Sequence, residues 1–272
     1  MAKIISYTNQ KGGVGKTTTC VNMASYVALM NKKVLLIDLD PQGNATSGLG
    51  INKDNKESKS IYNAISGDSA SSIIQRTFVE GLDIIASELN LAGAEIELVQ
   101  KENREKVLKN IINSIKDSYD YIFIDCPPSL GLLTVNALTA SDSIIIPIQC
   151  EYYALEGLSQ LMNTVKLVKK HLNPDIEIEG VVLTMKDARS NLVNEVSEEI
   201  KKFFGKKLYD SSIPRNIRLA EAPSHGKPIV EYDRKSKGGQ AYESLAVEFL
   251  NRNKDKFDKI KKIKKRKETF NG

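Results

Sequence analysis

The stretch KGGVGKTT, residues 11–18, decides the fold of this chain, because it stands between an apolar run and a helical pattern. The apolar run Ile4–Thr8 precedes this stretch, and the helical pattern Lys16–Met30 begins at the lysine inside it. A strand that leads through glycines into a helix is the context that a phosphate-binding loop requires. The alternative is a glycine-rich turn that merely begins a helix.

The loop predicts which groups meet the phosphates. Glycines let backbone N–H groups turn inward around phosphate oxygens, and the helix N-terminus adds the positive end of its dipole. We expect Lys16 to reach the β- and γ-phosphates of ATP, and the hydroxyl of Thr17 to ligate Mg²⁺. The sequence therefore predicts ATP and Mg²⁺ as cofactors.

Apolar runs of strand length alternate with helical patterns along the rest of the chain. Several runs are apolar on consecutive positions, as in strands that are covered on both faces. Such alternation predicts an α/β fold, a single-domain P-loop NTPase with a mostly parallel twisted sheet flanked by helices on both faces. The further expected strands are Val34–Asp38, Leu82–Ala86, Tyr121–Asp125, Ser143–Pro147 and Gly180–Thr184. The further expected helices are Leu91–Lys116, Ser129–Ala140, Leu155–His171, Leu192–Phe204 and Gln240–Asn251.

Three aspartates lie at the carboxyl ends of expected strands, the edge at which open α/β sheets bind ligands. Asp38 and Asp40 end one strand, and Asp125 ends another. Asp40 is the candidate for orienting the attacking water, and Asp125 for holding a Mg²⁺-bound water. Asp38 is a candidate for the Mg²⁺ shell or for fixing the loop. Any one of them alone could instead cap a helix.

Composition bounds the compartment and the domain plan. The N-terminus has no signal-peptide pattern, and no apolar run approaches the roughly 18 residues of a membrane span. The three cysteines are widely spaced and form no CxxC pair, so neither a disulfide framework nor a zinc site is expected. These features predict a cytoplasmic protein without integral membrane association.

The positive charge lies in the last residues. Residues 252–272 contain ten Lys or Arg and three Asp or Glu, whereas the whole chain has a net charge of only +5. We therefore expect an ATPase domain over residues 1–251 and a basic tail over 252–272. A disordered solvated tail, a DNA contact and a membrane contact are the alternatives for it.

The loop departs from the plain P-loop pattern. Gln10 stands where that pattern has glycine, and a second lysine, Lys11, lies five residues before Lys16. In this the loop resembles the deviant Walker A family. The resemblance implies that Lys11 reaches across a dimer interface to the partner's nucleotide, in trans, as an arginine finger does. A solvated surface lysine is the alternative.

Longer stretches resemble the ParA/Soj chromosome-partition ATPases over about residues 1–250. They are DPQGNATSGLG (40–50), DCPPSLGLLTVNALTA (125–140), QCEYYALEGLSQL (149–161) and IPRNIRLAEAPSHGKP (213–228). The resemblance implies an ATP-dependent dimerising ATPase for chromosome or plasmid partition. It would be a homodimer in its ATP state, associated with the nucleoid through nonspecific double-stranded DNA. A ParB-type centromere-binding partner would stimulate its hydrolysis.

The resemblance also assigns residues. Asp40 matches the catalytic aspartate, Pro214 and Asn216 match positions that border adenine, and Arg189 and Arg218 match arginines that contact DNA. Surface arginines in solvated loops are the alternative for the last two. The nucleotide loop is Lys11, Gly12, Gly13, Val14, Gly15, Lys16, Thr17 and Thr18, and the catalytic set is Lys11, Lys16 and Asp40.

Two rival functions share the deviant loop. A MinD-like division regulator would bind membranes in its ATP state through the tail, and Arg189 would be dispensable. An iron–sulfur reductase component or cluster carrier would need a cysteine pair at a dimer axis. Cys126 and Cys150 do not have the spacing expected for such a pair.

Overall fold

The structure, a computed structural model, describes residues 2–53, 58–151, 154–187 and 189–268. Seven strands form one sheet in the order β3-β4-β2-β5-β1-β6-β7, and every pairing is parallel except that of β3 with β4. The expected mostly parallel α/β fold is thereby confirmed. The strands are β1 Lys3–Tyr7, β2 Val34–Asp38, β3 Ile74–Arg76, β4 Leu82–Ile85, β5 Tyr121–Asp125, β6 Ser143–Gln149 and β7 Glu177–Thr184.

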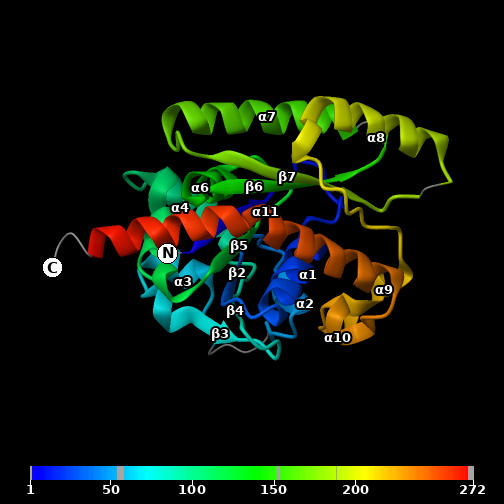
Figure 1. Ribbon diagram of the computed structural model, residues 1–272. Coiled ribbons are helices and arrows are strands. Elements are labelled where there is room, and N and C mark those ends of the chain that lie inside the picture. The colour runs from blue at the N-terminus through cyan, green and yellow to red at the C-terminus, as the bar shows by residue number, and fades with distance from the viewer. Residues whose placement is uncertain (1, 54–57, 152–153, 188, 269–272) are drawn as a thin grey trace.

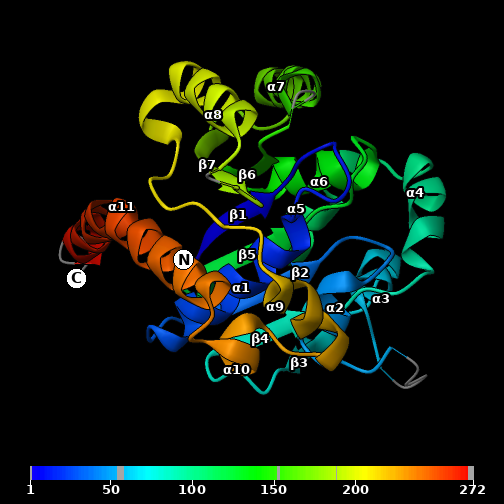
Figure 2. The ribbon, with the colours of Figure 1, turned by 90° about the vertical axis from the view of Figure 1, so that its right-hand side faces the viewer.

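Helices cover both faces of the sheet (Figures 1 and 2). Because side chains alternate along a strand, Leu36 and Phe123 pack toward α1, α10 and α11, while Leu35 and Ile122 pack toward α3, α4, α5 and α6. Helices α7 and α8 cover β6 and β7. The helices are α1 Lys16–Leu29, α2 Asn44–Gly48, α3 Ile61–Ser66, α4 Leu91–Val99, α5 Val107–Asn113, α6 Leu132–Ala140, α7 Ala154–His171, α8 Asn191–Phe204, α9 Ile217–Glu221, α10 Ile229–Asp233 and α11 Lys237–Glu268.

The helix expected over Leu91–Lys116 is wrong, because the chain breaks it into α4, a 3₁₀ turn and α5. Asn103 adopts a left-handed backbone conformation there, with φ of 52°. Asn136 on α6 then holds the start of α5, since its side chain accepts from the Leu108 N–H at 3.1 Å and donates to the Arg104 carbonyl at 2.8 Å. The residues between α4 and α5 are polar and offer no apolar side chain to pack on the body. A continuous helix would therefore gain no packing energy there.

Five short elements carried no periodic signal: the edge strand β3 and the helices α2, α3, α9 and α10, each of five or six residues. They are too short for a hydrophobic period to repeat often enough to be recognised. By contrast, α11 runs well beyond the expected Gln240–Asn251, so the expected boundary between domain and tail falls inside one helix. Among the described residues, no helix combines the length and the apolar character needed to cross a bilayer.

Candidate nucleotide site

The candidate site lies where three strands end at one edge of the sheet. Tyr7 of β1 and Asp38 of β2 are both register partners of Asp125 on β5. The loop that follows β1 therefore lies beside the aspartates that follow β2 and β5. A parallel sheet makes this meeting unavoidable, because the carboxyl ends of its strands share an edge.

The glycine loop wraps the start of α1. Gly13 and Gly15 have φ of 74° and 81°, a conformation that favours glycine. No side chain caps α1, and the first N–H groups of a helix have no partner within it. On the far side, the Thr184 hydroxyl donates to the Val14 carbonyl at 2.8 Å and ties the loop to β7. Gly12, Thr17 and Thr18 complete this loop, so backbone donors converge where an anion fits.

Lys16 is buried within this loop, with 6% of its surface exposed. Its Nζ donates to the Lys11 carbonyl at 3.0 Å. Burial lowers the pKa of Lys16, and the nearby Asp125, Cys126 and Asp40 oppose that shift. An ammonium has three N–H donors, so after the bond to the Lys11 carbonyl two remain that could donate to phosphate oxygens.

The carboxylate of Asp38 is occupied. Its oxygens accept hydrogen bonds from the Asp40 N–H at 3.2 Å, the Thr46 N–H at 2.8 Å and the Thr46 hydroxyl at 2.7 Å. Burial nevertheless raises its pKa. Asp40 in turn is held through its backbone carbonyl, which accepts from the Ser87 hydroxyl at 2.7 Å. Asp38 therefore shapes the loop that carries Asp40.

Asp125 is buried and unpaired. It is fully inaccessible, and neither carboxylate oxygen has a hydrogen-bond partner within the described part of the chain. Burial and the charge of Asp38 raise its pKa well above the usual range; the Thr17 hydroxyl is close enough to lower it in part, although it makes no well-formed bond. Because a buried carboxylate without a hydrogen-bond partner is costly, such a group at a ligand-binding edge suits a bound cation or a water that the cation carries.

Lys11 differs from Lys16 in exposure and in partner. Its side chain is 35% exposed, and its ammonium forms an ion pair with Glu151, which follows β6. Gln149 also donates to this carboxylate, through its side-chain amide. Lys11 therefore lies at the surface of the site, where a second molecule could meet it. The sequence had not indicated Glu151.

A cavity of about 320 Å³ opens beside the loop. Pro214 and Asn216, the two predicted base contacts, both lie in its wall next to Thr18. Met185 at its mouth has φ of 50°, a rare conformation for this residue type. The size suits an organic ligand that extends away from the phosphates. The remaining lining residues are Gly15, Thr184, Ile213, Arg215, Leu219, Ala220 and Tyr242.

Sequence patterns could have found only part of this wall. Thr184 ends an expected strand at the binding edge, so its position was available from the pattern. Leu219 and Tyr242 come from α9 and α11, more than 190 residues beyond the loop in the chain. Only the packing of these helices on α1 brings them to it.

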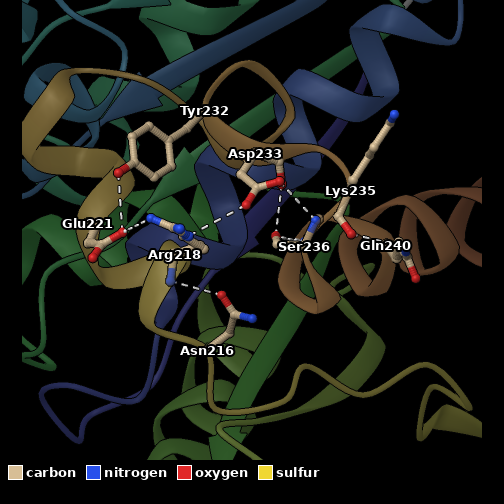
Figure 3. Close-up of polar contacts among 9 residues, drawn as sticks. Asn216, Arg218, Glu221, Tyr232, Asp233, Lys235, Ser236 and Gln240 are labelled. Carbon is tan, nitrogen blue, oxygen red and sulfur yellow. Dashed lines mark hydrogen bonds and ion pairs between the residues drawn. The ribbon is translucent and has the colours of Figure 1, made fainter.

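Both of the predicted DNA-contacting arginines form ion pairs with carboxylates. The Arg189 side chain is 91% exposed and pairs with Asp187. Arg218 on α9 pairs with Glu221 at 2.9 Å and with Asp233 at 3.6 Å (Figure 3). The Asn216 side chain caps α9 by accepting from the Arg218 N–H at 2.9 Å. One residue of the cavity wall therefore positions Arg218.

The three cysteines form no disulfide and no metal-ligand group in the described part of the chain. Cys20, Cys126 and Cys150 are all buried, and burial raises the pKa of each thiol. A raised pKa disfavours the thiolate that metals and clusters need. Within the ranges that the structure describes, no three His, Cys, Asp or Glu residues are grouped as metal ligands.

Comparison with known proteins places these features in a family. A family model described as an AAA domain matches residues 2–178. Sporulation initiation inhibitor protein Soj of Bacillus subtilis is 61% identical over 91% of this chain and 98% of its own length. Chromosome partitioning protein ParA of Myxococcus xanthus is 50% identical over 94% of this chain and 90% of its own length.

A solved structure adds ligands to the comparison. Cobyrinic acid a,c-diamide synthase from Mycobacterium smegmatis, with a bound ATP analogue and magnesium, has a TM-score of 0.82 and 34% identity. The match covers 93% of this chain and 96% of that one. A homologous protein with this fold therefore binds an ATP analogue and magnesium.

Proposed function

The chain belongs to the family of Soj and ParA chromosome-partitioning ATPases, and on that premise we propose that ATP switches it between a monomer that binds DNA poorly and a dimer that binds DNA well. The finer steps of this switch are dimerisation around ATP, nonspecific DNA binding and stimulation by a ParB-type partner. The role would be chromosome or plasmid partition in the cytoplasm, at the nucleoid. The observation that carries the proposal is the contrast between Lys16, buried in the loop, and Lys11, presented at the surface.

The nucleotide would lie along the loop with its base in the adjoining cavity. The turned N–H groups of residues 12–18 and the Lys16 ammonium bind the phosphates. Pro214 and Asn216 line the space for adenine. Mg²⁺, when bound, neutralises charge on the β- and γ-phosphates.

The residues present fit that cation. Asp125 is a buried carboxylate without a hydrogen-bonded partner among the described residues, and the Thr17 hydroxyl lies nearby. Thr17 would ligate the cation, and Asp125 would hold one of its waters. Asp38 is a weaker candidate, because its oxygens already accept bonds from the loop.

Asp40 would orient the water that attacks the γ-phosphate. It is 7% exposed and follows Asp38 directly at the binding edge. Its carbonyl accepts from the Ser87 hydroxyl and from the Gly43 N–H at 2.8 Å, and its Oδ1 accepts from the Gln42 N–H at 3.0 Å. The loop therefore holds the residue through its backbone and one carboxylate oxygen, and the other oxygen could bind a water. Phosphoryl transfer needs this positioning more than it needs covalent chemistry.

Lys11 would report on dimer formation. In the single chain its charge is neutralised by Glu151, in a pair whose side chains are 35% and 44% exposed. Exposed pairs of this kind contribute only about 0–1 kcal/mol. A partner subunit's triphosphate, with several negative charges, would compete well for Lys11. The dimer would therefore form only around ATP.

The dimer would then present Arg189 and Arg218 twice. Each phosphate contact is weak alone, so two linked sets of contacts raise affinity steeply. The carboxylates beside each arginine oppose DNA binding. A DNA phosphate must displace Asp187 from Arg189, and it must displace Glu221 and Asp233 from Arg218. A ParB-type partner would end the bound state by stimulating hydrolysis.

Binding to random-sequence duplex DNA tests the proposal with ATP, with ADP and without nucleotide. We expect ATP to strengthen binding in the wild type and in Asp40→Ala, but not in Lys16→Ala. Arg189→Glu should weaken ATP-dependent binding at least tenfold. Lys202→Glu, which removes another exposed, ion-paired cation, is the matched control and should change it little.

The proposal fails if ATP leaves DNA binding unchanged in the wild type, or if Lys16→Ala responds to ATP normally. ATP-dependent binding to anionic vesicles without ATP-dependent DNA binding would instead indicate a MinD-like function.

A further inference from the structure

Helix α11 changes character along its length. Its first part, residues 237–253, carries two basic and two acidic residues, whereas residues 254–267 carry nine basic and two acidic residues. The helix nonetheless continues without interruption to Glu268. We call residues 254–267 the basic arm.

The arm is rooted in the body at a buried residue. Asn253 is fully inaccessible, and its side-chain amide donates to Glu179 on β7 at 2.9 Å and to the Phe249 carbonyl at 2.9 Å. The Lys3 ammonium donates to the Asn253 side-chain oxygen. The helix therefore leaves the body from a fixed point.

Arg252 adds a second anchor one residue earlier. Its guanidinium lies 4.2 Å from the centre of the Tyr209 ring and donates to the Leu208 carbonyl at 2.8 Å. It also pairs with Glu248 on the same helix. Two adjacent anchored residues set the direction as well as the position in which the arm begins.

The root is remote from the nucleotide site. Lys3, which contacts Asn253, begins β1, whereas the phosphate loop follows the other end of that strand. Figures 1 and 2 show α11 starting near α9 and α10 and ending past the N-terminus of the chain. A ligand of the arm would thus bind without contacting the nucleotide.

The charge density of the arm suits duplex DNA. Fourteen helical residues extend about 21 Å at 1.5 Å per residue, so a net charge of +7 from residues 254–267 gives about one positive charge per 3 Å. Duplex DNA carries one negative charge per about 1.7 Å of its axis. A lipid surface would need a continuous apolar face on the helix, yet only Phe257, Ile260 and Ile263 are apolar in this stretch.

We propose that the basic arm is a second DNA-binding site, which contacts the phosphate backbone without regard to sequence or nucleotide state. DNA binding by the arm is separate from the ATP switch and does not require it. Its role would be to keep the ATP-free protein weakly associated with DNA, so that ATP-driven dimers form where DNA is already near. Soj aligns over 98% of its own length but only 91% of this chain, so part of this chain lies outside the aligned region.

The test reverses charge in the arm of the full-length chain. The variant K261E/K262E/K264E/K265E keeps the Arg252 and Asn253 anchors. Binding to random-sequence duplex DNA is measured without nucleotide over 50–200 mM salt, in the wild type and in a Lys16→Ala background. Without ATP, we expect the arm variant to lose at least tenfold in affinity. The slope of log affinity against log salt should become less steep by about 3, since each lost phosphate contact removes about 0.9.

The matched control makes the same change in net charge on α7, α8 and the turn after α8. The variant K166E/K170E/K201E/K206E replaces four exposed lysines of the body. It should lose less than threefold in affinity and keep the wild-type salt slope. Thermal unfolding of both variants should match that of the wild type, which shows that the anchors still hold.

Equal losses in the two variants would overturn the proposal, because they would reflect net charge alone. No loss in the arm variant would also overturn it. So would arm-dependent binding to anionic phospholipid vesicles together with no arm-dependent binding to DNA. The ATP-driven increment in DNA binding should survive in the arm variant, so a missing increment in the wild type would count against the ATP switch and not against the arm.

Discussion

The two ends of β1 each meet a cluster of buried charges, and the clusters differ in how completely they are paired. At the amino end, Glu179 bonds with Lys3, Asn253 and Ser143. At the carboxyl end, Asp125 has no hydrogen-bonded partner in the part of the chain that is described, and Lys16 donates to a single carbonyl. The first cluster is complete, whereas the second has room for a ligand.

The contrast separates structural charges from functional ones. A buried carboxylate that accepts several hydrogen bonds has its desolvation compensated by those partners. If one partner is removed, the remaining buried polar groups are left without compensation for their desolvation, and the fold is destabilised. A buried carboxylate without hydrogen-bond donors lowers the stability of the free protein. Such groups are found at functional sites, where a bound ligand supplies the partners. The pKa values follow this division: that of Asp125 is raised by burial, while Lys3 and hydrogen bonds outweigh burial and hold that of Glu179 below its usual range.

The largest effect is expected at the complete cluster. Glu179→Gln should lower the free energy of unfolding by about 3–5 kcal/mol, because it removes the charged carboxylate that faces the buried Lys3 ammonium. Urea unfolding monitored by circular dichroism measures this. The exposed Glu199→Gln is the control, and it should change stability by no more than about 0.5 kcal/mol. A change of the same small size in Glu179→Gln would break the comparison.

The opposite result is expected at the incomplete cluster. Asp125→Asn should reduce the rate of Mg²⁺-dependent ATP hydrolysis about 100-fold, since removing one preorganised polar group from an active site has effects of this order. Without nucleotide at pH 8, the same variant should be more stable than the wild type by about 1–3 kcal/mol, because an unpaired buried charge is gone. A less stable apo variant at that pH would show that Asp125 is already paired.

The pH dependence of stability sharpens the difference. A carboxyl with a raised folded-state pKa costs stability once the pH exceeds its unfolded pKa, so the advantage of Asp125→Asn should grow as the pH rises from 4 to 8. A carboxyl with a lowered folded-state pKa stabilises above its unfolded pKa, and it loses this contribution as the pH falls through the folded value. The deficit of Glu179→Gln should therefore shrink below about pH 4. Urea unfolding of both variants at several pH values measures these trends. If the stability differences of Asp125→Asn and Glu179→Gln from the wild type changed with pH in the same direction, the assignment of the two raised and lowered pKa values would be contradicted.

The smallest effect is expected at an exposed cluster. Arg218 is shared between Glu221 and Asp233 (Figure 3), and Glu221→Gln should free it for DNA phosphates and raise ATP-dependent DNA affinity about two- to fivefold, because exposed pairs are weak. Fluorescence anisotropy with labelled duplex DNA is sensitive enough for this change. Glu199→Gln again serves as the control, and a fall in affinity would argue that Glu221 orders Arg218 for DNA.

Much of the fold was predictable because its signals are local. The buried strands β2 and β5 are each apolar at four consecutive positions, and the glycine loop follows β1 directly. The break between α4 and α5 was not predictable, since it depends on Asn136 from α6. The short α9 carries Arg218 and part of the cavity wall, yet five residues show no recognisable period.

The sequence by itself determined the chemistry at the edge of the sheet. A strand, a glycine loop, a lysine and strand-end aspartates lie close together in the chain or are brought together by parallel pairing, so their meeting follows from local pattern and one rule of topology. Only the tertiary structure decided which charges are paired. Glu151 beside Lys11, Asp233 beside Arg218, and Asn253 beside Glu179 are contacts made through packing. No spacing in the sequence encodes them, because each depends on the angle at which one helix or loop crosses another.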